Sequence, residues 1–187
     1  MAMHLVPHIF KTWSREAGAF GRCRRGIASL EFAMILPLMA VLLFGTIDVG
    51  RLLTDYQLVS KSVRDATRFL ARTDATALGL DKTACTINNT SMPVTEAKNL
   101  ALTGMIDGDP NTDALLGYWT DPTSITVTPT CWDNSGGTYS GFYAGVDNIP
   151  IITMQATVSF PFLNGWILDR GPTLTFDLSH QEIFVGE

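Results

Sequence analysis

The sequence predicts an α+β protein in which a long N-terminal helix packs on a small antiparallel sheet. Two observations carry this prediction: an apolar run at residues 27–47 that continues as an amphipathic pattern over residues 48–75, and short alternating segments in residues 76–187. A chain of 187 residues is long enough to bury a core. Its net charge of −5 excludes a general nucleic-acid binder.

The apolar run, IASLEFAMILPLMAVLLFGTI, has the length of a membrane span and holds one charged residue, Glu31. Residues 1–26 carry five basic residues and one acidic residue, a charge of +4, which leaves −9 for the rest of the chain. A basic flank of this kind predicts a single pass through the inner (cytoplasmic) membrane, with a cytoplasmic N-terminus and a periplasmic C-terminal domain.

A cleavable secretory signal peptide fits the run poorly. Such peptides have an apolar region of about 7–15 residues followed by a small-x-small cleavage site. This run is longer, and no A-x-A pattern follows it. Glu31 also lies inside the run, where a carboxylate is costly and is by default a functional residue with a partner.

The residues around Gly26 resemble the cleavage site of a type IV prepilin. Arg24 and Arg25 precede the glycine, and Glu31 is the fifth residue after it. The resemblance implies that a prepilin peptidase recognises the basic leader, residues 1–26, and cuts between Gly26 and Ile27. The cut creates an α-amine at Ile27, and the Glu31 carboxylate can pair with the same amine of a neighbouring subunit during assembly.

The stretch from Arg24 to Leu70 resembles the N-terminal region of TadE-like proteins, minor pilins or pseudopilins of tight-adherence (Flp) pili. The matching features are Glu31-Phe32, Leu36-Pro37, Phe44-Gly45, Asp48, Gly50-Arg51 and Ala66-Thr67-Arg68. The resemblance implies a type IV pilin-like fold and a role in pilus assembly for adhesion or secretion, with other pilins and the assembly platform as partners. A TadF-like protein remains an alternative; TadG-like proteins usually carry a larger exported region.

The pattern after the apolar run predicts that the helix continues to about Thr73, with Gly79 as a stop signal. Its apolar stripe, widened by Leu53 and Phe69, consists of Leu52, Tyr56, Val59, Val63, Ala66 and Leu70. The stripe packs either on other pilin helices or on the chain's own sheet. Pro37 predicts a kink in the helix, the alternative being a tolerated transmembrane proline.

The exported residues predict one short helix and three strands. Ser91 and Gly104 are the expected caps of the helix. Apolar residues alternate in SITVTPTCW, IITMQATVSF and TLTFDLSHQEIFV. Residues 133–145 predict an exposed loop with aromatic side chains, and residues 160–166 form an apolar patch that caps the core or meets another subunit.

Residue chemistry favours neither an enzyme nor a cofactor. After Gly26 the chain has one histidine, His180, which lies in a strand-like segment, so we expect neither a catalytic triad nor a histidine-based metal site. A weak calcium candidate has the spacing D-x-D-x-N-x-D and consists of Asp107, Asp109, Asn111 and Asp113. It lacks the expected sixth-position glycine and twelfth-position glutamate, so the alternative is an acidic turn in which Asp109 caps a short helix from Pro110.

Cys85 and Cys131 both lie in the exported part, where an oxidising compartment allows a disulfide; two free thiols are the alternative.

Two classes of function remain. The chain is either a processed minor pilin or pseudopilin, or an uncleaved membrane-anchored periplasmic binding module.

Overall fold

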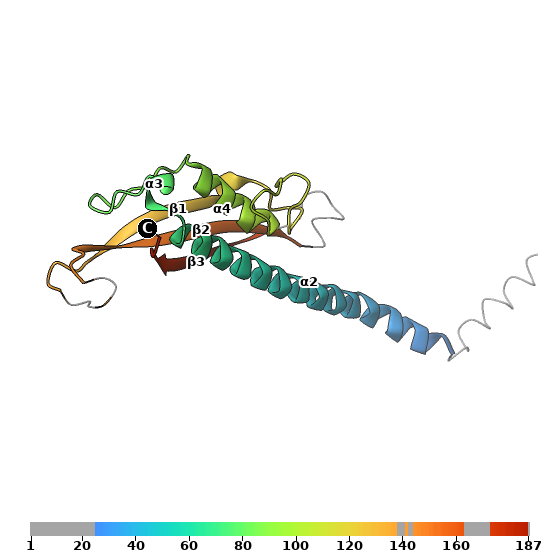
Figure 1. The fold of residues 1–187 in the computed structure, drawn as a ribbon. Coiled ribbons are helices and arrows are strands. Elements are labelled where there is room, and N and C mark those ends of the chain that lie inside the picture. Colours follow the sequence, from blue (N-terminus) through green and yellow to red (C-terminus); the bar gives the residue numbers. More distant parts are fainter. Residues whose placement is uncertain (1–24, 138–140, 142–143, 163–172, 187) are drawn as a thin grey trace, which may run out of the picture. The chain divides into compact units, whose positions relative to one another are not determined.

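The computed structural model describes residues 25–137, 141, 144–162 and 173–186 (Figure 1). The elements in chain order are helices α2 (Arg25–Ala71), α3 (Ala75–Leu78) and α4 (Met92–Thr103), the 3₁₀ turn η1 (Pro122–Ser124), and strands β1 (Ile125–Asp133), β2 (Asn148–Pro161) and β3 (Thr173–Ile183). The chain divides into two compact units, Met1–Ile47 and Asp48–Glu187. The fold is therefore α+β, with a long apolar N-terminal helix and a small antiparallel sheet, as the sequence predicts.

The sheet of the second unit has the order β1-β2-β3, and both neighbouring pairs are antiparallel. Ala156 in the central strand pairs with Ile125 on one side and Leu178 on the other. The inward side chains of β2 are all buried: Ile152, Met154, Ala156, Val158 and Phe160. The predicted alternation is thus confirmed for β2, because every second side chain of a strand faces the same way.

The stripe on α2 is buried only from Val59 onward. Val59, Val63 and Leu70 are buried in the same core as residues of α4 and of the sheet, whereas Leu53 is 57% exposed and Tyr56 is 45% exposed. Packing within the chain's own domain therefore accounts for the C-terminal half of the stripe. The first residues of the stripe are left outside that core.

The helix ends differ from the prediction. α2 ends at Ala71, and Gly79 terminates α3 instead, in the left-handed conformation with φ of 66°. A new helix starts because the Asp74 carboxylate accepts a hydrogen bond from the Thr76 backbone N–H at 2.7 Å. Near the chain's C-terminus, the N–H groups of Val185 and Gly186 donate to the carbonyl of Ala71 and satisfy the end of α2.

The predicted short helix is confirmed as α4, between Ser91 and Gly104. Gly104 has a φ of 78°, which gives a left-handed cap, and the Ser91 hydroxyl makes no cap hydrogen bond.

At the base of the predicted loop, the Asn134 side chain donates to the carbonyl of Val146 at 2.9 Å. The loop aromatics Tyr139, Phe142 and Tyr143 lie outside the described residues, as do residues 163–166 of the apolar patch. Phe160, which begins that patch, is buried and contacts Phe162 edge to face.

A disulfide bond joins Cys85 to Cys131, with a Cα–Cα distance of 5.8 Å and a sequence separation of 46. Cys85 lies in a turn closed by the bridge between Asp81 and Thr86, and Cys131 lies in β1. The bond therefore ties a loop between two helices to one edge of the sheet.

A second long-range contact joins Tyr118 to α2. Its hydroxyl donates to the Asp55 carboxylate at 2.6 Å, and its ring contacts Phe160 edge to face. Burial, followed by the hydrogen bond to Asp55, raises the pKa of Tyr118 above its ordinary value of 10.0. The segment after α4 is thus held against the part of α2 that belongs to the second unit.

Replacing both Cys85 and Cys131 with serine is expected to lower the free energy of unfolding by about 4 kcal/mol, the chain-entropy value for a loop of this length. Chemical unfolding followed by circular dichroism measures the loss. Thiol labelling of the denatured, non-reduced Cys23→Ser protein should find no free thiol, and two labelled thiols would contradict the bond.

Tyr118 is expected to ionise well above pH 10. The folded protein keeps the phenol proton at a pH where the unfolded chain loses it, so the stability from this group is complete below pH 10 and falls as the pH rises further. The tyrosinate absorbance of the wild type and of Tyr118→Phe should therefore match near pH 10 and diverge only at higher pH. A difference with a midpoint near 10 would contradict the burial argument.

Candidate functional site

The predicted cleavage point lies in the first turn of α2. The helix begins at Arg25 and includes Gly26 and Ile27, and side chains are described from Ala28 onward. Arg24 and the rest of the basic leader lie outside the described residues. The cleavage point between Gly26 and Ile27 and the leader's role in recognition both stay predictions.

From Ala28 to Ile47, α2 is apolar and exposed on every side. It is long and apolar enough to cross a membrane. Its exposed large apolar side chains before residue 48 are Leu30, Phe32, Met34, Ile35, Leu36, Leu38, Met39, Val41, Leu42, Leu43, Phe44 and Ile47. If these side chains stayed in water, the protein would lose on the order of 10 kcal/mol or more of the stabilisation that burying them gives. This exposed apolar surface is compatible with a single-pass membrane anchor.

Glu31 is the one charged residue of this surface. It is exposed between Leu30 and Phe32, and within the described part of the chain it forms no ion pair. Glu31 lies four residues, about one helical turn, after Ile27 along α2. A carboxylate in such surroundings needs a cation, and the amine that cleavage would create is of the right charge.

Pro37 lies within α2, and the helix continues on both sides of it. The missing proline N–H leaves the carbonyl of Ala33 without its usual helical partner. The kink at Pro37 stays a prediction.

The second unit begins with charged residues that hold the helix to the domain. Arg51 lies 3.7 Å from Asp48, whose side chain is largely buried, and its guanidinium sits 5.6 Å from the centre of the Phe160 ring. One helical turn on, Asp55 accepts the hydrogen bond from Tyr118. Sequence reasoning missed Tyr118, because 63 positions separate it from Asp55 and no local pattern joins them.

The weak calcium candidate uses its own polar groups in a turn. Asp109 accepts hydrogen bonds from the backbone and side-chain nitrogens of Asn111, both at 2.9 Å, and these bonds lower the pKa of Asp109. Asp113 accepts the backbone N–H of Asp109 at 3.1 Å. Asp107 adds no third acidic partner: the described residues hold no group of three or more side chains placed to bind a metal. The helix expected from Pro110 is also wrong, since residues 110–112 form a hydrogen-bonded turn.

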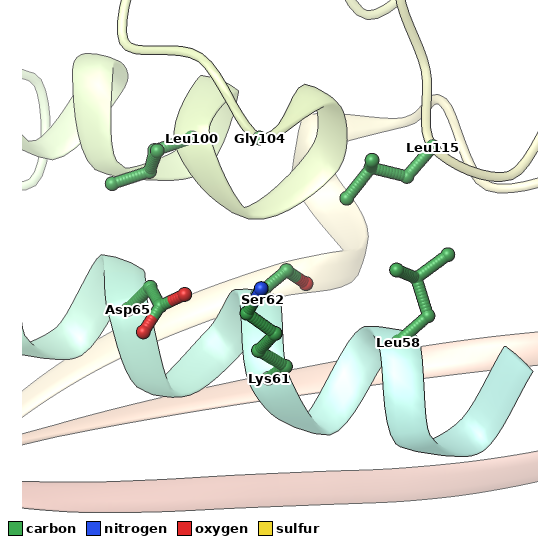
Figure 2. Close-up of a pocket in the computed structure, with 7 residues that line it drawn as sticks. All are labelled: Leu58, Lys61, Ser62, Asp65, Leu100, Gly104 and Leu115. Atoms are coloured by element: carbon green, nitrogen blue, oxygen red, sulfur yellow. The ribbon is translucent and has the colours of Figure 1, made fainter.

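A pocket of about 150 Å³ lies between α2 and the end of α4 (Figure 2). Its lining residues are Leu58, Lys61, Ser62, Asp65, Leu100, Gly104 and Leu115. The leucines make it mainly apolar, and among the described residues no ion pair joins Lys61 to Asp65. The pocket has room for one small apolar group beside two opposite charges.

His180, the other candidate for chemistry, lies in β3. Its Nε2 is 3.3 Å from a carboxylate oxygen of Glu182, and the second oxygen of Glu182 is 3.7 Å from Arg68 of α2. This group ties the helix to the edge of the sheet.

A comparison with known families finds one match, to the TadE-like protein family, over residues 26–68. No curated protein and no solved structure matches the chain. The matched residues begin at the predicted cleavage glycine and include Glu31, Pro37 and the charged residues that open the second unit. TadE-like proteins are pilus-associated structural proteins and are not known as enzymes. Residues 26–68, which include the predicted cleavage glycine and the predicted assembly carboxylate, are therefore similar to the TadE-like family.

Proposed function

We propose that this chain is a minor pilin or pseudopilin of a tight-adherence pilus, made as a precursor and assembled through its N-terminal helix after cleavage at Gly26. The observation that carries the proposal is that the TadE-like match begins at Gly26 and covers the exposed apolar segment before Asp48, in which Glu31 is the one charged residue. The role is adhesion or secretion. The partners are a prepilin peptidase, other pilins or pseudopilins, and the assembly platform.

The proposed domain organisation follows the changes in side-chain chemistry along the chain. Residues 1–26 are the basic leader, 27–47 the transmembrane helix, 48–75 its exported continuation, and 76–187 the strand-rich periplasmic domain. The charge of +4 in the leader favours a cytoplasmic N-terminus, since basic residues near a membrane span stay inside. The division into compact units between Ile47 and Asp48 supports the second boundary.

In the proposed mechanism, Arg24 and Arg25 mark the leader, and Gly26 lets the peptidase approach the backbone closely. Cleavage exposes a positive α-amine at Ile27. Glu31 pairs with this amine of a neighbouring subunit and so sets the axial register of the two helices. Pairing offsets the cost of keeping either charge in an apolar surrounding.

A second candidate function is an uncleaved, membrane-anchored periplasmic binding module. The pocket between α2 and α4 is the observation that favours it, because its leucines and its two unpaired charges fit a small amphipathic ligand. This candidate needs no cleavage and gives Glu31 no role.

The N-terminus of the membrane-extracted protein separates the two functions. In cells with an active prepilin peptidase, we expect N-terminal sequencing and intact mass to show a chain that begins at Ile27. Gly26→Trp should retain the leader, because its side chain obstructs the approach of the protease. A full leader on the wild-type chain in such cells would favour the anchored module.

Glu31→Ala is expected to leave cleavage unchanged and to lower the amount of assembled pili at least tenfold, since an unpaired charge in an apolar surrounding costs several kcal/mol and each 1.4 kcal/mol is a factor of ten. Immunoblots of sheared pili and of membranes measure the two effects. Met34→Ala, which trims an exposed apolar side chain of the same helix, is the matched control. Normal assembly by Glu31→Ala would refute the pairing role of the carboxylate.

A further inference from the structure

We propose that the second unit lies on the phospholipid headgroups of the membrane through an apolar patch where α2 meets the start of β3. This seam patch consists of Val49, Leu53, Tyr56 and Leu174. The inference rests on the membrane anchoring in the proposed function. It adds to that function a lipid surface as the partner of the second unit.

The seam patch is apolar and open to solvent. Val49 is 54% exposed, Leu53 57%, Tyr56 45% and Leu174 41%. The first three are spaced by four and three residues in α2, so they follow one face of the helix. The Tyr56 ring contacts Phe176 with centroids 5.6 Å apart, and Phe176 lies two positions after Leu174 on the same face of β3. The helix and the strand therefore contribute to one continuous surface.

The seam patch is close in the chain to the apolar segment of α2. Val49 comes two residues after Ile47 and Leu53 six residues after it, which is about 9 Å at 1.5 Å per residue. The headgroup layer is about 5–7 Å thick on each side of a hydrocarbon core of about 30 Å. Helical side chains lean toward the N-terminus of their helix, so Leu53 leans toward the apolar segment. A membrane crossed by that segment thus brings headgroups to the patch.

The side chains in and beside the patch have the chemistry of a membrane interface. Tyr56 combines an apolar ring with a hydroxyl group, and such rings concentrate at the level of the headgroups. The Arg51 side chain is 44% exposed, and a guanidinium binds phosphate oxygens well. An apolar partner helix would leave both polar groups without a hydrogen-bond partner of its own. Phospholipid offers both the apolar layer and the phosphates.

Leu174 separates this proposal from simple anchoring by the helix. Leu53 lies near lipid wherever an anchored α2 leaves the membrane, whereas Leu174 reaches lipid only if the start of β3 also lies on it. With exposed fractions of 57% and 41%, the two residues together expose about one whole leucine side chain. Burial of that area favours the lipid-bound position of the second unit about 10- to 100-fold.

Nitroxide labels at two positions of β3 test the proposal. The full-length protein carries Cys23→Ser with either Leu174→Cys or Ser179→Cys, and the disulfide between Cys85 and Cys131 keeps its own thiols from labelling. Ser179 is exposed in the same strand. The protein is diluted in vesicles of phosphatidylethanolamine and phosphatidylglycerol. Compared with the label at residue 179, we expect the label at residue 174 to collide more often with oxygen and less often with a water-soluble nickel chelate.

A second substitution in the patch gives the effect a size. Leu53→Ser removes more than half of the exposed leucine area and should raise the nickel collision rate at residue 174 about 4- to 15-fold. Met92→Ser is the matched control, because it trims an exposed apolar side chain of α4 outside the patch. It should leave the collision rate at residue 174 unchanged.

The proposal is overturned if residue 174 is as accessible to nickel as residue 179, or if Leu53→Ser and Met92→Ser have the same effect. A label shielded from both oxygen and nickel also overturns it and assigns the patch to a protein contact. Alkaline carbonate extraction of the same vesicles reports anchoring, and N-terminal sequencing reports cleavage. An anchored protein with residue 174 in water therefore refutes the lipid contact alone, whereas release by carbonate refutes the anchoring on which it rests.

Discussion

The exposure of an apolar helix surface on every side, from Leu30 to Ile47, is the constraint on which the rest of the structure depends. A helix that is apolar on every side has no polar face that water can solvate. From Val59 to Leu70 the same α2 becomes amphipathic and buries one face in the core of the second unit. The change between these patterns falls where the chain divides into its two compact units, and Asp48 and Arg51 begin the second.

The second unit is a small α+β domain whose parts are tied together at points far apart in the sequence. The Tyr118 hydroxyl holds the segment after α4 to Asp55, the disulfide holds the turn at residues 81–86 to β1, and Glu182 holds β3 to Arg68. These three contacts lie around a core of modest size. They offset the conformational entropy that the long connecting segments lose on folding. They fix the C-terminal half of α2 against the sheet.

Glu31 is the residue whose surroundings bear most directly on the proposed assembly. In that proposal an apolar surrounding makes the carboxylate costly, and a cation from a neighbouring subunit would offset the cost. The argument depends on the charge pattern of α2, in which Glu31 is the one charged residue between Ala28 and Ile47.

The sequence by itself determined the long apolar helix, the cleavage and assembly residues as predictions, the caps of α4, and the alternation of β2, because each depends on residues close together in the chain. Only the tertiary structure decided which part of the α2 stripe is buried, that Gly79 closes a separate helix, that Asp109 lies in a turn, and that Tyr118 meets Asp55. It also decided that β3 is an edge strand, since a pattern with a period of two reveals a buried face but not the neighbours of a strand. Such facts depend on contacts between distant residues, and local periodicity carries no information about them.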